Sequence, residues 1–600
     1  MDRSGAGHRG RLVALLACSV VLLSGCYAAN VRHPPTVASC NASYEDGRTT
    51  VCRGPGDAPP VGADSRVAND VDRVVAQCQE DLTAADELDR QRQGHCVDLY
   101  YRATLRTARA LQISGLLSVS RRQSAWEIYH QGLSGLIDAG QRYGQLNPRG
   151  RLTIQSCGTR VIPISYHGFA WQPEDFSQLV RADTFQSREI SDRYASCGLG
   201  LTLVGVRIAA CPDEVFFRPR QPFAVTAVLR PITQSNLSDD PAASTVAGES
   251  VLEFYNPHVS NAVDWDGAQI ALARDLTAPL AAVVSEGQRQ YLRGFTAPSD
   301  TSVKPKLVLT EPYQRGKIPV VFIHGMYSDP ITWADTINGL RSQIDLYQQY
   351  QFWVFRYPTG GAVLESGAAL RDNLRLVRQV YNPQHDDAAL DAMVLVGHSL
   401  GGLLAKMQIV NSYDLLWNQA ASQPFGAVRA SAEMRLRLNQ NFFFEPLPFV
   451  SRVVFIGTPH RGSALARRLA GRLGSSLVKF GTEEKAEYRE LMDDNRDIFN
   501  AWIVRSRPTS VDFVEPTNPF LIALEEMPVN PATQMHSIVG TGGLSLGEPG
   551  DGVVTVRSAR VCGVQSELLV SAKHEKLHRH PDSIAELARI LRAHAAAQSW

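Results

Sequence analysis

The chain has 600 residues, more than one ordinary hydrophobic core accommodates, so its length predicts two or more domains. Hydrophobic residues make up 44% and charged residues 20%, which is typical of globular proteins. The 60 Lys and Arg residues equal the 60 Asp and Glu residues. This neutrality argues against a nucleic-acid partner, because proteins that bind nucleic acids usually carry a basic excess.

The first residues have the features of an export signal. Three arginines precede the apolar run 12–23, which is too short to span a membrane comfortably. The stretch LLSGC, which ends at Cys26, resembles the bacterial lipobox, whose cysteine is acylated after cleavage. The resemblance implies a signal peptide over 1–25 and a lipoprotein anchored through Cys26, on the outer membrane facing the periplasm, since Tyr27 is not the aspartate of inner-membrane retention. A short membrane helix with a chance cysteine is the alternative.

The next segments predict a tether and an accessory part. Residues 26–65 are rich in Pro, Gly, Asp and Ser, which predicts a tether. Residues 66–150 carry apolar residues at steps of three and four, which predicts a helical region. Residues 151–300 show short β-runs between turns, followed by an expected helix over 269–287, and predict a β-rich accessory domain. Ten cysteines are present; the eight outside the signal and the lipobox either form disulfides or stay reduced.

Residues 301–600 alternate short β-runs with helical segments, for example at 364–381, 403–413 and 582–594. This alternation predicts an α/β fold: a parallel sheet with helices on both faces and a ligand site at the carboxyl ends of the strands. The expected strands are 319–324, 351–357, 393–397, 452–457, 536–540 and 567–571.

Three motifs compete for the active site: G-x-S-x-G at Ser399, a second G-x-S-x-G at Ser545, and H-E-x-x-H over 574–578. A nucleophile elbow needs a strand, a sharp turn and a helix in succession. Ser399 meets this requirement, whereas Ser545 is followed by LGEPGDG, which cannot form the helix. Zinc binding by H-E-x-x-H would need a continuous helix, but a β-run leads directly into the motif and Pro581 follows it.

The C-terminal half resembles the lipase and esterase branch of the α/β-hydrolase superfamily over about residues 305–600. The resemblance rests on the strand that ends in His324 and Gly325, on the Ser399 elbow and on RVVFIGTPHRGS at 452–463. It implies an oxyanion hole formed by two backbone N–H groups. These are the N–H groups of Met326 and Leu400.

The superfamily order of serine, acid and histidine selects the other two catalytic candidates. Asp551 lies in a Gly-Asp-Gly turn similar to the turn that carries the lipase acid, although a plain turn aspartate is the alternative. His574 follows the last β-run and is the expected base, with His578 as the alternative. His460 is expected to be a loop residue outside the triad.

Together these residues predict a serine esterase or lipase that forms an acyl-enzyme on Ser399. No metal or organic cofactor is expected; the expected partners are an ester or lipid substrate and, through Cys26, the membrane. Residues 414–451 are long enough for a cap, and their run NFFFEPLPFV either lines an acyl pocket or packs in the core. The alternatives are an envelope-binding lipoprotein with a non-catalytic hydrolase scaffold and a zinc metallopeptidase that uses His574 and His578.

Overall fold

The computed structural model divides into two units, residues 1–53 and residues 54–600. In the first unit, β1 (Ser43–Glu45) and β2 (Arg48–Thr50) form an antiparallel hairpin. The predictions of a signal peptide, of acylated Cys26 and of most of the tether lie outside the described residues. The described residues are 43–45, 48–50, 65–112, 119–155, 158–187, 190–209, 215–232, 250–287, 304–463, 481–505 and 507–598.

In the described part of residues 65–287, called here the N-terminal region, three long helices precede a seven-stranded sheet and a fourth helix follows it. The helices are α2 (Ser65–Arg90), α3 (Cys96–Gln112) and α4 (Val119–Arg142), as the apolar spacing predicted. The sheet has the order β3-β4-β5-β10-β9-β8-β6 and is antiparallel except where β5 pairs with β10. Its strands are β3 (Leu146–Asn147), β4 (Arg151–Ile154), β5 (Arg160–His167), β6 (Gln178–Arg181), β8 (Leu201–Ile208), β9 (Arg220–Pro231) and β10 (Ser250–Tyr255).

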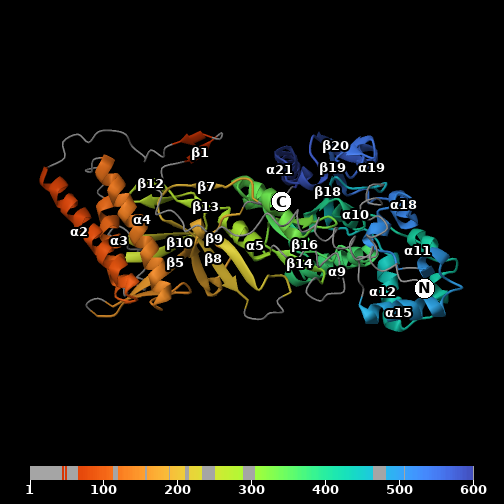
Figure 1. The fold of residues 1–600 in the computed structure, drawn as a ribbon, viewed down its shortest axis with the longest axis horizontal. Coiled ribbons are helices and arrows are strands. Elements are labelled where there is room, and N and C mark those ends of the chain that lie inside the picture. The colour runs from red at the N-terminus through yellow and green to blue at the C-terminus, as the bar shows by residue number, and fades with distance from the viewer. Residues whose placement is uncertain are drawn as a thin grey trace, which may run out of the picture. The chain divides into compact units, whose positions relative to one another are not determined.

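The two faces of this sheet are covered differently. Side chains such as Leu203 and Val225 share one hydrophobic cluster with α2, α3 and α4, which Figure 1 shows packed beside the sheet. Val204 and Val206 point the other way and pack against α5 (Ala278–Gly287). The alternation of side chains along β8 therefore places α5 on the face opposite the three long helices.

The helix predicted over 269–287 is wrong in its first half. Its first residues form β12 (Ala268–Ala271), which pairs with β11 (Ala262–Trp265), and β13 (Arg274–Asp275), which pairs with β7 (Ala195–Ser196). The helix α5 begins only at Ala278, beside a proline in its first turn. Proline suits the first turn because the missing N–H has no intrahelical acceptor there.

Residues 304–598, called here the C-terminal region, contain the second seven-stranded sheet, with the order β14-β16-β15-β17-β18-β19-β22. Only the edge pair β14 and β16 is antiparallel; all other pairs are parallel. All six expected strands are present. The strands are β14 (Lys306–Leu309), β15 (Ile318–Ile323), β16 (Tyr350–Arg356), β17 (Met393–His398), β18 (Val450–Ile456), β19 (Gln534–Gly540) and β22 (Val564–Val570).

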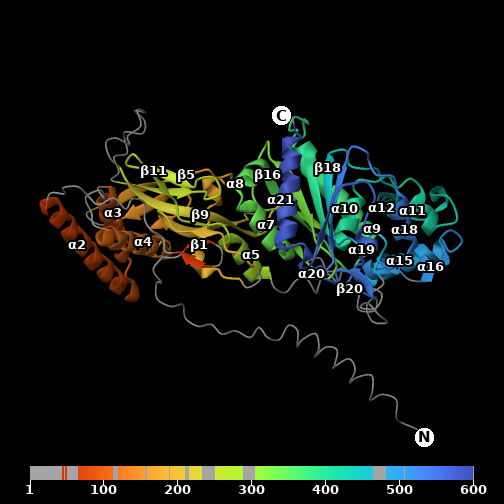
Figure 2. The same ribbon diagram turned by 90° about the horizontal axis from the view of Figure 1, so that it is seen from above.

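Alternate residues of the central strands pack on opposite faces of this sheet. On β15, Val321 and Ile323 join the cluster that contains α9 (Val363–Tyr381) and α10 (Leu400–Lys406). Val320 and Phe322 join the cluster that contains α7 (Ala334–Arg341) and α21 (Pro581–Ala596). Figure 2 shows α7 and α21 side by side. Helices on both faces are what the alternation of β-runs and helical segments predicted.

The helix α10 is shorter than the segment predicted as helical over 403–413. After Lys406 the N–H groups of Gln408 and Ile409 donate to the carbonyl groups of Ala405 and Lys406, so the last turn tightens. Val410 then pairs with Val529 as an isolated bridge. The chain leaves the helix because this bridge replaces the next helical hydrogen bonds.

Several short helices connect the strands of the C-terminal region. In the run NFFFEPLPFV, Phe444, Leu447 and Phe449 are buried in the main core, so this part is a packed loop. The short helices are α8 (Ile344–Gln349), α11 (Leu415–Ala420), α12 (Ala432–Phe442), α15 (Thr482–Asp494), α16 (Ala501–Arg505), α17 (Ser510–Phe513), α18 (Pro519–Glu526), α19 (Val556–Ala559) and α20 (His574–Leu577).

Two observations concern the predicted export of the chain: the state of its cysteines and the length and hydropathy of its helices. Cys78 and Cys96 are buried free thiols, and burial raises the pKa of the Cys96 thiol to about 11. At least these two cysteines therefore follow the reduced alternative. Among the described helices, none is both long and apolar enough to cross a membrane.

Candidate active site

The parallel strands bring the candidate residues to one edge of the C-terminal sheet. Strands β15, β17, β18, β19 and β22 run in the same direction, so their carboxyl ends lie together. Met326 follows β15, Ser399 follows β17, Asp551 follows β19 and His574 follows β22. Residues far apart in the sequence therefore meet at one place, as the predicted topology requires.

Ser399 lies at a sharp turn between β17 and α10. Its backbone has φ 54° and ψ −125°, and its N–H donates to the carbonyl of Ile456 at 2.9 Å. A side chain at Gly401 would place its Cβ 2.2 Å from the Ile323 carbonyl oxygen, and one at Gly397 would lie 2.5 Å from the Gly401 oxygen. The turn therefore requires both glycines of the motif, and Ser399 itself holds a strained conformation.

The second G-x-S-x-G motif has a different structure. It forms the hairpin of β20 (Gly543–Ser545) and β21 (Glu548–Gly550), with Leu546 and Gly547 at positive φ in the turn. Ser545 is 2% exposed, and its hydroxyl donates to the Val553 carbonyl at 2.9 Å. A buried hydroxyl in a hairpin has no helix behind it and no access to a substrate.

Asp551 and His574 form a hydrogen-bonded pair. Asp551 Oδ2 lies 2.7 Å from His574 Nδ1, and the Asp551 carbonyl accepts from the His574 N–H at 2.9 Å. Asp551 Oδ1 accepts from the N–H groups of Val553 and Val554 at 2.9 and 2.7 Å. Because a carboxylate only accepts, the Nδ1 atom carries the ring proton and Nε2 is left as the basic nitrogen. The side chain of Asp551 is 1% exposed and that of His574 is 12% exposed, so only the imidazole reaches the surface.

Ser399 lies next to this pair without being hydrogen-bonded to it. The ring of His398, the preceding residue, donates from Nε2 to the His574 carbonyl at 3.0 Å, and its centroid lies 4.8 Å from that of the His574 ring. Within the described residues, no hydrogen bond joins the Ser399 hydroxyl to His574. In enzymes without substrate such bonds are often long and shorten when the substrate binds.

The loop after β15 approaches Ser399 from the other side. A Cβ on Gly325 would lie 2.9 Å from the Ser399 Cβ, so the backbone that leads to Met326 passes directly beside the serine. The Tyr357 hydroxyl donates to the His324 carbonyl at 2.8 Å and its ring stacks on the His324 ring, which holds the start of the loop. Tyr327 in this loop has φ 56°, so the site contains a second residue, besides Ser399, with a strained backbone.

The two histidines of H-E-x-x-H have separate roles. His578 Nε2 lies 2.7 Å from Thr332 Oγ1 and 2.9 Å from the Thr332 carbonyl, while His574 bonds to Asp551. His578 is 2% exposed, and burial lowers its pKa to about 3. The motif forms the short helix α20, and His578 is its C-cap residue. Among the described residues, no group of three metal-ligating side chains occurs.

His398 and His460 are buried histidines outside this pair. The His398 ring lies between the rings of His574 and His578, and burial together with these neighbours lowers its pKa well below the usual value. His460 is 1% exposed and packs edge-on against Phe455 in the loop after β18. Sequence reasoning missed the contacts of His398 and His578, because Thr332 and His578 are 246 residues apart and no local pattern marks the contact.

A cavity of about 180 Å³ lies between α12, α15, α16, α17, α18 and the start of α9. Its lining is mainly apolar, with Leu438, Phe442, Met492, Ile503 and Phe513 among the side chains. Met326 packs against the same hydrophobic cluster that contains Phe442 and Phe513. The ion pair of Arg507 with Glu365, at 2.8 Å, lies at the lining as well.

Comparison with protein families gives one match, the Alpha/beta hydrolase family, at residues 320–586. Residues 320–586 form an α/β-hydrolase domain. This range runs from within β15 through β22 and includes the elbow and the Asp551–His574 pair described above, whereas β14 precedes it. The β-rich N-terminal region with its helices precedes it. No curated protein matches the sequence.

Solved structures similar to the chain include several esterases and lipases. The mature form of a Bacillus licheniformis lipase is 18% identical with a TM-score of 0.29, over 46% of this chain and 93% of that chain. A Thermogutta terrifontis esterase is 13% identical with a TM-score of 0.25, over 48% and 94%. An Exiguobacterium antarcticum esterase is 13% identical with a TM-score of 0.24, over 49% and 96%.

Proposed function

We propose that the protein is a carboxylic ester hydrolase with Ser399 as nucleophile, His574 as base and Asp551 as the acid that orients the base. The observation that carries the proposal is the 2.7 Å contact of Asp551 Oδ2 with His574 Nδ1, at the sheet edge where Ser399 stands on a strained turn. A serine, a histidine and a buried acid in this chain order make up the catalytic group of serine hydrolases.

The proposed reaction proceeds through an acyl-enzyme. Ser399 Oγ forms a bond to the ester carbonyl carbon while its proton passes to His574 Nε2. The imidazolium, stabilised by Asp551, then gives the proton to the leaving alkoxide as the carbon–oxygen bond breaks. Water, deprotonated by His574, then attacks the acyl-enzyme carbonyl; the bond to Ser399 Oγ breaks, His574 returns the proton to Oγ, and the acid leaves.

The oxyanion of each tetrahedral intermediate accepts hydrogen bonds from the N–H groups of Met326 and Leu400 in this proposal. Leu400 is the first residue of α10, and the first N–H groups of a helix have no intrahelical acceptor. The loop that carries Met326 passes beside Ser399. Loss of one such donor raises the barrier by about 3 kcal/mol.

The proposed substrate is a lipid or another acyl ester. Support comes from the cavity of about 180 Å³, whose buried apolar lining residues belong to the hydrophobic cluster against which Met326 packs; Ser399, Asp551 and His574 do not line this cavity. An apolar cavity of comparable size, about 150 Å³, binds small apolar molecules in another protein. We further propose that acylated Cys26 anchors the enzyme to the outer membrane on its periplasmic side, which would bring it close to lipid substrates.

Labelling of the full chain with a fluorophosphonate tests this function. Wild-type protein is expected to take up the probe and to hydrolyse p-nitrophenyl butyrate. Ser399→Ala is expected to lose both, whereas Ser545→Ala, in which only a buried hairpin hydroxyl is removed, is expected to keep both. Turnover that survives in folded Ser399→Ala protein would refute the proposal.

A further inference from the structure

Helix α7 lies in the same chain segment as the proposed oxyanion residue Met326. The loop after β15 continues through a 3-10 turn at Pro330–Trp333 directly into α7. Every residue of α7 is buried. Ile337 and Leu340 pack in the cluster under the sheet, and Thr336 donates to the His578 carbonyl at 2.8 Å. This face of the helix belongs to the hydrolase domain.

The polar face of α7 is bound by the N-terminal region. Asp335 and Asn338 are three positions apart and therefore lie on the same face of the helix. Asp335 accepts from the N–H and the hydroxyl of Ser191, at 2.7 and 3.0 Å. Asn338 donates to the Asp192 carbonyl at 2.8 Å and accepts from the Thr277 hydroxyl at 3.0 Å.

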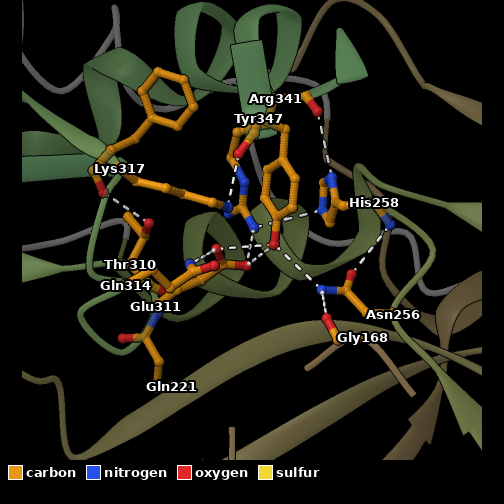
Figure 3. Close-up of polar contacts among 11 residues, drawn as sticks. Gly168, Gln221, Asn256, His258, Thr310, Glu311, Gln314, Lys317, Arg341 and Tyr347 are labelled. Atoms are coloured by element: carbon orange, nitrogen blue, oxygen red, sulfur yellow. Dashed lines mark hydrogen bonds and ion pairs between the residues drawn. The ribbon is translucent and has the colours of Figure 1, made fainter. Parts of the chain in front are cut away.

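The last residue of α7 enters a third set of contacts, which Figure 3 shows. The Arg341 carbonyl lies 3.3 Å from His258 Nδ1, and the guanidinium pairs with Glu311 at 2.6 Å. The His258 ring stacks on the Tyr347 ring with centroids 4.4 Å apart, and Asn256 donates to the Tyr347 hydroxyl at 3.3 Å. His258 and Asn256 belong to the N-terminal region, whereas Arg341, Glu311 and Tyr347 belong to the C-terminal region.

Apolar contacts extend this attachment toward the oxyanion loop. Ile190, Ala281 and Val284 of the N-terminal region form one small cluster with Ala334. Ile331, in the 3-10 turn between the loop and α7, packs against this cluster. The N-terminal region therefore contacts the segment on its loop side as well as along the helix.

We infer that the N-terminal region positions the oxyanion hole. It holds α7 in place and thereby the loop that presents the Met326 N–H to the oxyanion. Asp335 and Thr277 are positioning residues in this scheme, since they touch neither Ser399 nor a substrate. The inference rests on the proposed function and assigns a role to the first half of the chain. Without these contacts, α7 would lose the partners of its polar face and the loop would lose its distal support.

Variants at Asp335 test the inference in the full chain. Asp335→Ala leaves the Ser191 N–H without its acceptor and is expected to lower kcat for p-nitrophenyl butyrate about tenfold or more, below the hundredfold or greater loss that removal of a whole oxyanion donor causes. KM is expected to change less than about twofold, because the loop stabilises the transition state rather than the bound substrate. Asp335→Asn keeps an acceptor for Ser191 and is expected to restore most of kcat.

A matched pair of threonines supplies the second measurement. Thr277→Val removes the hydroxyl that donates to Asn338 and accepts from the Tyr194 N–H at 2.9 Å, whereas Thr226→Val removes another buried hydroxyl, which donates within the N-terminal region to the Ala273 carbonyl at 2.6 Å. We expect Thr277→Val to lower kcat several-fold and Thr226→Val to leave it unchanged. Both are measured at 20 °C, after circular dichroism has shown that the variants are folded.

The outcomes separate the two claims. Wild-type kcat in folded Asp335→Ala or Thr277→Val protein, together with an inactive Ser399→Ala variant, overturns the positioning role and leaves the proposed function intact. Equal losses in Thr277→Val and Thr226→Val also overturn it, because they indicate a general loss of stability. Activity that survives in Ser399→Ala instead overturns the proposed function.

Discussion

Replacement of Asp551 by asparagine should inactivate the protein while leaving its fold almost intact. The amide oxygen of asparagine can still accept from the N–H groups of Val553 and Val554, which bond to Oδ1 at 2.9 and 2.7 Å. The amide nitrogen then faces His574 Nδ1 in place of a carboxylate oxygen. Because this nitrogen only donates, Nδ1 must become the acceptor and the ring proton moves to Nε2. An imidazole with its proton on Nε2 cannot take the proton of Ser399.

The expected magnitudes differ sharply between activity and stability. A wrong tautomer of this kind lowers kcat about 10⁴-fold, which corresponds to about 5.5 kcal/mol of activation free energy. The free energy of unfolding should fall by about 1.5–3 kcal/mol, because one charge-assisted hydrogen bond is lost and two backbone contacts remain. Asp551→Ala should lose about 1–3 kcal/mol more for each N–H left without an acceptor.

The assay combines steady-state hydrolysis of p-nitrophenyl butyrate with urea unfolding of the full chain. Asp387→Asn is a matched control, since Asp387 is also buried and also accepts from backbone N–H groups, at 3.1 Å from Ala389. Asp387 precedes the amino end of β17, whereas Ser399 follows the carboxyl end of the same strand. The control should keep wild-type kcat. Near wild-type turnover in folded Asp551→Asn protein would show that Asp551 does not orient the base.

Three further predictions concern the base, acid stability and the anchor. His574→Ala should lower kcat by about three orders of magnitude or more. His578→Ala should lower kcat far less, because the His578 ring is buried against Thr332. A larger loss in His578→Ala than in His574→Ala, measured with the same ester, would assign the base to His578. Burial lowers the pKa of His578 to about 3 and that of His324 to about 4, both from 6.5, so the unfolded chain binds more protons below pH 6.5. The free energy of unfolding should therefore be fully retained above pH 6.5 and fall by up to about 1.4 kcal/mol per pH unit for each histidine as the pH drops toward 4; a flat urea-unfolding profile between pH 7.5 and 5 would contradict this. Cys26→Ser should release the protein from membranes, and palmitate labelling that persists in this variant would argue against the anchor.

The strands of the hydrolase domain were predictable because each is a short apolar run whose alternate residues pack on the two faces of the sheet, as on β15. The Ser399 elbow was also readable locally, since its strand, two glycines and helix follow one another in one stretch. The same logic separated it from Ser545, whose neighbours form a hairpin. Chain order then singled out Asp551 and His574, which the structure brings within 2.7 Å.

Local patterns failed where tertiary pairing overrides them. The segment 269–287 has helical spacing, yet β12 and β13 find strand partners in the N-terminal region and only α5 remains helical. The helix after Ser399 ends early because Val410 pairs with Val529. The partner of β12 is the neighbouring strand β11, whereas β13 and Val410 pair with segments distant in the sequence; in each case these hydrogen bonds replace those that a helix would make.

By itself the sequence determined six strands of the C-terminal sheet, the nucleophile turn and the order of the candidate catalytic residues, because these depend on patterns a few residues long. Only the tertiary structure decided that His578 binds Thr332 and that Asp335 of α7 binds Ser191, across 246 and 144 residues of chain. Nothing in the composition of these segments indicates a partner, since a buried polar side chain is defined by what the fold places opposite it. Helix α7 has one face on the C-terminal sheet, while α5 and the segment 190–192 of the N-terminal region contact its other face.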